Sequence, residues 1–86
     1  MEFRIDRMCF DKCMTVYDLA AQIALTSGHE KRVKRAHIVK GNYIGVAVEF
    51  EDELQTYDLN GLAILLGCKR AVVCRRGNTE YVCGFL

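Results

Sequence analysis

The chain contains YDLAAQIAL at residues 17–25 and YDLNGLAIL at residues 57–65, and these two stretches decide the predicted fold. Apolar residues recur in both at helical spacing, which is typical of an amphipathic helix that packs on a sheet. Each stretch is preceded by a Glu-Phe pair and followed by a glycine, a Lys-Arg-Ala start, a short apolar run and a Gly-Asn pair. The same features in the same order indicate an internal duplication.

Capping residues support both helices. Thr15 and Asp18 have the spacing of a capping box at the start of the first helix, and Gly28 supplies its left-handed C-terminal cap. Thr56 or Asp58 can cap the second helix, which Gly67 ends. Both stretches are therefore predicted to be short, well-delimited helices.

Two hairpins are predicted around the Gly-Asn pairs at residues 41–42 and 77–78. Glycine at the first central position of a two-residue loop is typical of a type II′ turn, which fixes the strand register. The predicted opposite pairs are Lys40–Tyr43, Val33–Phe50, Lys34–Glu49 and Arg32–Glu51 in the first hairpin, and Arg76–Thr79, Val73–Val82, Cys74–Tyr81 and Arg75–Glu80 in the second.

Arg35 and His37 conflict with this register. The predicted register places Arg35 and His37 on the same face as Val46 and Val48. Burying a cation on that face raises the free energy of the fold unless the cation is paired. We expect them at an uncovered edge of that face, with a buried polar site as the alternative.

With a first strand over residues 2–6, the element order becomes β-α-β-β-α-β-β. Its first six elements have the ferredoxin-like order. The sequence therefore predicts an α+β fold made of a duplicated β-α-β-β unit, with one ferredoxin-like antiparallel sheet and two helices on one face. We expect a single domain over residues 1–86, with pseudo-repeats over residues 1–45 and 46–86.

Length and composition favour a binding module over an enzyme. The chain has 86 residues, of which 51% are hydrophobic and 27% charged, with a net charge of +1. A domain this small has little room for a deep active-site cavity. The sequence also lacks a glycine-rich phosphate loop, a Ser-His-Asp order and a paired-carboxylate motif. We expect no catalytic residues, no cofactor and no membrane partner.

Five cysteines occur without a secretory signal pattern, which predicts a reducing, cytoplasmic location and free thiols. They are Cys9, Cys13, Cys68, Cys74 and Cys83. A zinc site built from Cys9, Cys13, His29 and His37 is the alternative. Structural zinc sites usually have two close ligand pairs, which the two histidines do not form, so no metal site is predicted.

Charge is segregated along the chain, which suits a protein partner because complementary patches steer association and fix register. The predicted partner-binding residues are the acidic Glu49, Glu51, Asp52 and Glu53 and the basic Lys31, Arg32, Lys34, Arg35, Arg70 and Arg76. Binding of RNA or DNA through the basic strands is the alternative function. The aromatic pair that an RNA-reading sheet uses for base stacking is missing from the basic segments, so this function ranks second.

In size and general type the chain is similar to small viral or mobile-element inhibitors that bind a host defence complex, such as anti-CRISPR proteins. This likeness implies an inhibitor that occludes a surface of another protein.

A twofold homodimer is predicted from the last strand, residues 81–86, which has apolar residues on both faces. Placed at a sheet edge, such a strand needs a second copy to cover it. If the strand lies in the middle of a sheet, this argument for a dimer disappears.

Overall fold

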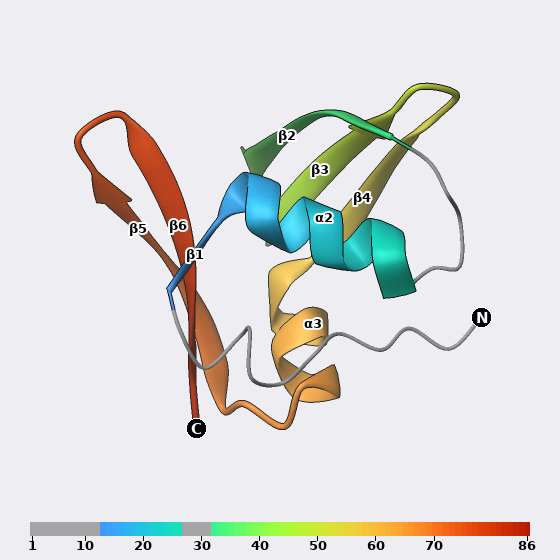
Figure 1. Ribbon diagram of the computed structural model, residues 1–86. Coiled ribbons are helices and arrows are strands. Elements are labelled where there is room, and N and C mark those ends of the chain that lie inside the picture. Colours follow the sequence, from blue (N-terminus) through green and yellow to red (C-terminus); the bar gives the residue numbers. More distant parts are fainter. Residues whose placement is uncertain (1–12, 27–31) are drawn as a thin grey trace.

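A computed structural model describes residues 13–26 and 32–86 of the protein. Two helices and six strands make up this part of the chain (Figure 1). They are β1 (Met14–Thr15), α2 (Val16–Thr26), β2 (Val33–Lys40), β3 (Ile44–Phe50), β4 (Leu54–Asp58), α3 (Leu59–Leu65), β5 (Arg70–Arg76) and β6 (Thr79–Phe85).

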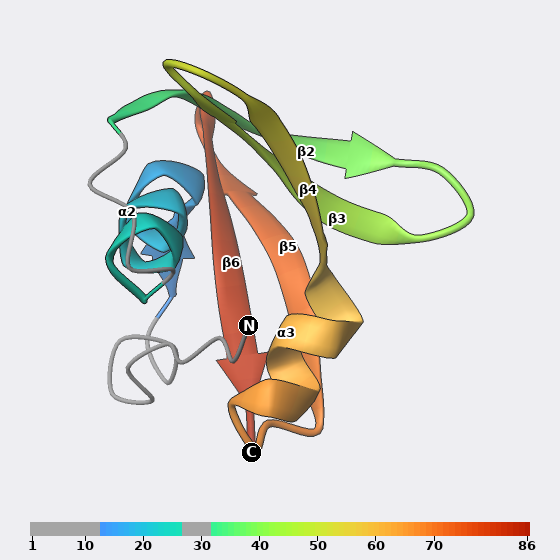
Figure 2. The same cartoon turned by 90° about the vertical axis from the view of Figure 1, so that its right-hand side faces the viewer.

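The strands form two separate three-stranded antiparallel sheets, ordered β1-β6-β5 and β2-β3-β4. Helix α2 contacts β2 of one sheet and β6 of the other, and α3 contacts β3 and β5. Both helices therefore join the two sheets, as Figures 1 and 2 show. The α+β class is confirmed, whereas the prediction of one ferredoxin-like sheet is wrong.

Strand β4 has no counterpart among the predicted strands. Sequence reasoning began the second helix near Tyr57, but residues 54–58 pair along β3, with Val46 opposite Tyr57 and Val48 opposite Gln55. Strand β4 thereby completes a three-stranded sheet with β2 and β3. The predicted first strand, residues 2–6, lies outside the described residues.

One hydrophobic core lies between the helices and the inner faces of both sheets. Its most completely buried side chains are Leu19, Ile23, Val46, Val48, Leu59 and Val82. These residues come from both helices and both sheets, so burial of apolar surface holds the two sheets together as one unit. Within the described residues, no helix is long and apolar enough to cross a membrane.

The predicted helix caps are present where the structure describes them. The Thr15 backbone N–H donates to Asp18 Oδ2 at 3.3 Å, and the Asp18 backbone N–H donates to Thr15 Oγ1 at 3.1 Å. Asp58 caps α3 by accepting from the backbone N–H groups of Asn60 and Gly61. Gly67 follows α3 with a φ of 72°, the left-handed conformation expected of a C-terminal glycine. Gly28 lies outside the described residues.

The second hairpin has the predicted register. Arg76 pairs with Thr79, Val73 with Val82, and Gly77 has a φ of 60° at the first central position of the turn.

In the first hairpin, most of the predicted register is wrong by one residue. Lys40 pairs with Ile44 instead of Tyr43, and Arg35 pairs with Glu49 in place of Lys34. A β-bulge between Val33 and Arg35 then restores the predicted Val33–Phe50 pair.

The shifted register moves Arg35 and His37 from the predicted inner face to the outer face, so both expectations for them, an uncovered edge of the inner face or a buried polar site, are wrong. Ala36 and Ile38 pair with Val48 and Val46 on the inner face, so the intervening Arg35 and His37 point outward and are exposed. Burying Arg35 and His37 without partners would cost more than the irregularity in the strand.

Strand β6 lies in the middle of its sheet, between β1 and β5. The premise of the dimer argument, an edge position for this strand, is therefore wrong. Pairing on both sides explains how Val82 and Cys83, whose side chains point to opposite faces, are both buried.

Candidate functional site

Most of the predicted partner-binding residues lie at one end of the β2-β3-β4 sheet. Lys34, Arg35 and Glu49 lie on paired segments of β2 and β3, Arg32 directly precedes β2, and residues 51–53 form the turn between β3 and β4. The basic and acidic groups are thus neighbours here and do not form two distant patches. Lys31 lies outside the described residues.

Charge in this cluster is partly neutralised. Arg35 donates from Nε and Nη2 to Glu49 Oε2, at 3.2 and 3.0 Å. Lys34 Nζ lies 3.9 Å from Glu49 Oε1. One carboxylate therefore faces two cations, which leaves less positive charge for a phosphate backbone than the sequence suggests.

Arg70 and Arg76 do not join this cluster. They lie at the two ends of β5, in the other sheet. The Arg70 guanidinium carbon lies 5.2 Å from the centre of the Phe85 ring, and that of Arg76 lies 5.9 Å from the centre of the Tyr81 ring. Both distances fit cation–π contacts within the β5–β6 hairpin.

The outer face of the β2-β3-β4 sheet is turned away from both helices (Figure 2). Successive rows across this face are Arg35–Glu49–Leu54, His37–Ala47–Thr56 and Val39–Gly45–Asp58. The residues of β3 in the last two rows are small.

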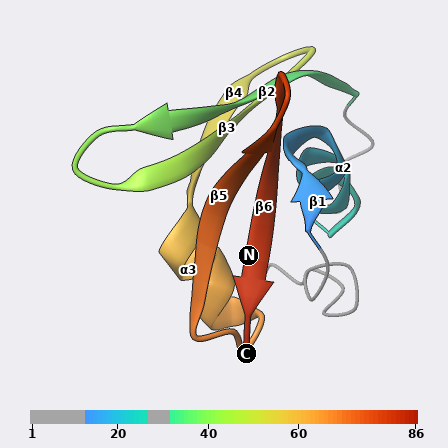
Figure 3. The same cartoon turned by 90° about the vertical axis from the view of Figure 1, so that its left-hand side faces the viewer.

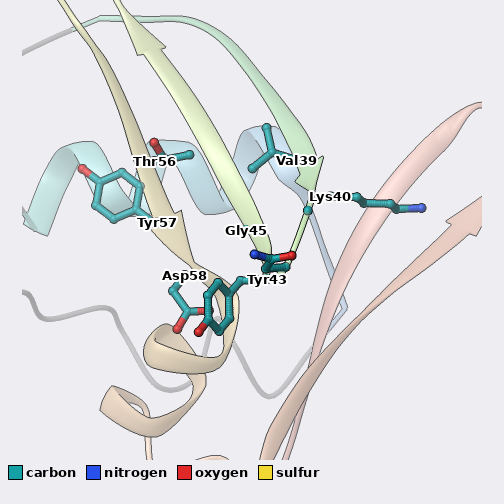
Figure 4. Close-up of a pocket in the computed structure, with 9 residues that line it drawn as sticks. Val39, Lys40, Tyr43, Gly45, Thr56, Tyr57 and Asp58 are labelled. Carbon is teal, nitrogen blue, oxygen red and sulfur yellow. The ribbon is translucent and has the colours of Figure 1, made fainter.

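An open, mainly apolar hollow of about 540 Å³ lies at the end of this face, where the last row meets the β2–β3 turn (Figure 4). It is lined by Val39, Lys40, Gly41, Asn42, Tyr43, Gly45, Thr56, Tyr57 and Asp58. A Cβ atom at Gly45 would lie only 2.6 Å from the Tyr57 carbonyl oxygen, so the close approach of β3 and β4 requires glycine.

The β2–β3 turn beside the hollow projects from the body of the protein in views from two opposite sides (Figures 2 and 3). Tyr43 at this turn is 74% exposed, and the neighbouring Ile44 is 45% exposed. Aromatic residues are enriched in protein interfaces, where they bury a large area with few rotatable bonds. Tyr43 and Ile44 are therefore well placed to contact another molecule.

Sequence reasoning identified the turn at residues 41–42 but missed the hollow beside it. The hollow needs β4, which was assigned to a helix, and the actual register, which brings Gly45 opposite Asp58. The sequence does hold one usable signal. Tyr43, Ile44 and Gly45 follow the turn directly, and a glycine within a strand marks a close backbone approach.

A second group of chemically reactive side chains lies on the outer face of the β1-β6-β5 sheet. A disulfide joins Cys13, directly before β1, to Cys83 on β6, with a Cα–Cα distance of 4.3 Å. The free thiol of Cys74 on β5 lies with its Sγ 2.7 Å from Cys83 Sγ. All three sulfur atoms lie within 4.8 Å of one another.

This sulfur cluster corrects two expectations. Cys13 and Cys83 are not free thiols, and their disulfide argues against the predicted reducing compartment, because disulfides persist mainly in oxidising environments. The cysteines that come together also differ from the zinc set considered above. His37 is on the exposed face of β2, while Cys9 and His29 lie outside the described residues.

The hollow beside Tyr43 and the sulfur cluster are thus two separate sites on different sheets. No family model matches the chain, and neither a curated protein nor a solved structure matches it.

Proposed function

We propose that this protein is a small protein-binding module that acts by covering a surface of its partner. The observation that carries the proposal is the apolar hollow at the projecting β2–β3 turn, with Tyr43 exposed beside it. The partner it fits is a protein that inserts an apolar side chain into the hollow and packs against Tyr43 and Ile44. Hot spots of protein interfaces have this form, in which an aromatic anchor borders a pocket.

The charges on the same sheet face favour a protein over a nucleic acid. Arg35 makes two hydrogen bonds to Glu49, and Lys34 lies near the same carboxylate. Arg70 and Arg76 belong to the other sheet. Binding of a phosphate backbone gains its energy from several cations that replace counterions, and here the cations are dispersed or paired.

Tyr43→Ala tests the proposal, with Tyr17→Ala as a matched control. Tyr17 is also a well exposed tyrosine, at 60%, but lies on α2, on the opposite side of the β2-β3-β4 sheet from the outer face. The partner is first isolated from source cells with the wild-type chain and then purified. Calorimetric titration should show that Tyr43→Ala weakens binding tenfold or more, about 1.4 kcal/mol, while Tyr17→Ala changes it less than twofold.

Three outcomes would contradict the proposal. Equal effects of the two variants would place the contact elsewhere. The chain could instead bind RNA or DNA tightly, with an affinity that falls steeply as salt is added. If Lys34→Ala and Arg70→Ala reduce that affinity, the nucleic-acid function is favoured. The third outcome is a molecular mass that doubles in light scattering as the protein concentration rises. If Tyr43→Ala keeps this mass at the monomer value, a second copy of the chain occupies the hollow.

A further inference from the structure

We propose that Cys13, Cys74 and Cys83 form a thiol–disulfide exchange site, in which Cys74 displaces Cys13 from Cys83 and presents Cys13 as an exposed thiol to a disulfide outside the protein. The proposal is independent of the partner-binding hollow, because the sulfur cluster lies on the other sheet.

The strand register brings the three sulfur atoms together. Met14 pairs with Val82, so the preceding Cys13 faces Cys83 across the β1–β6 pair. Cys74 pairs with Tyr81 and is therefore the diagonal neighbour of Cys83 across the β5–β6 pair. Residues at such diagonal positions share one face of a sheet and are within reach of each other. Cys83 is thus the central sulfur, with one candidate partner on each side.

The contact between Cys74 and Cys83 is suited to exchange. The Cys74 Sγ atom lies directly beside the Cys83 Sγ atom, at 2.7 Å, with no other group needed to bring them together. Disulfide exchange proceeds by attack of a thiolate on one sulfur of a disulfide, and access to that sulfur is one of the factors that set its rate. Here the attacking sulfur is already in place, on a rigid hairpin beside its target.

The internal step needs no outside oxidant or reductant. The Cys74 thiol loses its proton to solvent, and its thiolate forms a bond with Cys83 Sγ. The Cys83–Cys13 bond breaks, its electron pair leaves with Cys13 Sγ, and Cys13 takes up a proton from solvent. One disulfide and one thiol are present before and after the step.

Burial gives the exchange a direction toward the surface. Cys83 is buried and Cys74 half-buried, whereas Cys13 is exposed. The step therefore moves the free thiol from a shielded position to an accessible one. The Cys13 thiolate can then attack an outside disulfide, forming a mixed disulfide at Cys13 and releasing the other half as a thiol.

Trypsin can map the exchange, because cleavage after Lys and Arg separates all five cysteines. Cys9, Cys13, Cys68, Cys74 and Cys83 fall into the peptides 8–12, 13–31, 41–69, 71–75 and 77–86. The folded protein is incubated with N-ethylmaleimide at mildly alkaline pH, the remaining thiols are blocked in denaturant with a second reagent, and the peptides are identified by mass spectrometry without reduction.

We expect maleimide on peptide 13–31 and a disulfide between peptides 71–75 and 77–86, both increasing with incubation time. Replacing maleimide by oxidised glutathione should give a glutathione adduct on peptide 13–31. If maleimide instead reacts only with peptide 71–75 and the disulfide between 13–31 and 77–86 persists, the proposal is wrong.

Three variants complete the test. Cys74→Ser should leave the Cys13–Cys83 disulfide intact and Cys13 unlabelled, whereas the control Cys68→Ser, which changes a cysteine outside the cluster, should behave as wild type. Cys13→Ser covers the case in which Cys74→Ser does not fold. In the Cys13→Ser variant, oxidised glutathione should produce the Cys74–Cys83 disulfide. Glutathione adducts on both Cys74 and Cys83, without that disulfide, would overturn the proposal.

Discussion

The β2–β3 and β5–β6 hairpins carry the same Gly-Asn pair at their turns and yet reach different registers. In β5–β6, a two-residue turn leaves Val73 and Val82 together on the inner face. The same turn in β2–β3 would place Arg35 and His37 on the inner face. The chain instead uses a longer turn and a bulge. Turn residues thus set the register only where they agree with the burial pattern of the strands.

The largest expected effect is that of Gly45→Ala, which tests the close contact between β3 and β4. The new Cβ would lie 2.6 Å from the Tyr57 carbonyl oxygen, and a backbone atom cannot move aside cheaply. We expect a loss of about 1–3 kcal/mol in the free energy of unfolding, measured by urea denaturation. An unchanged free energy would show that β3 and β4 are not so close.

A medium effect should distinguish the two turns. Gly77 has a φ of 60°, a conformation that disfavours residues with a Cβ, whereas Gly41 does not have a positive φ and would meet no atom within 4 Å. Gly77→Ala should therefore cost about 1 kcal/mol, and Gly41→Ala should change stability by less than about 0.5 kcal/mol. Thermal unfolding of both variants measures the difference, and equal losses would mean that the turns are alike after all.

The smallest expected effect concerns the cross-strand ion pairs. Arg35 donates twice to Glu49, while Arg75 Nη2 donates once to Glu80 at 2.9 Å, and both arginines are about two-thirds exposed. Double-mutant cycles with alanine should give coupling energies of about 0.2–1 kcal/mol, larger for the Arg35 pair and reduced by salt. A stronger coupling for Arg75 would show that the second hydrogen bond of Arg35 adds nothing.

The parts of the fold that local chemistry determines could be predicted from the sequence. The capping box of Thr15 and Asp18, the cap at Asp58 and the turn at Gly77 each depend on residues only a few positions apart. The division into two sheets could not be predicted in this way. It depends on whether residues 54–58 pair with β3, which long-range packing decides.

The candidate sites show the same limit. Lys34 was predicted opposite Glu49 and Arg35 on the other face of the strand, whereas the actual register places Arg35 opposite Glu49, so the Arg35–Glu49 pair was missed. The disulfide was missed, because Cys13 and Cys83 are 70 positions apart and only the β1–β6 pairing brings them together. Counting cysteines cannot reveal such a contact.

The Cys13–Cys83 disulfide also makes nearly the whole described chain one covalent ring. A protease that cuts the projecting β2–β3 turn would open this ring without dividing the molecule, so the cut protein would migrate as one band on a denaturing gel until a reductant is added. If the bond moves to Cys74, the ring shrinks to a separation of nine residues within one hairpin. The two pieces of the cut chain would then separate in denaturant without any reductant.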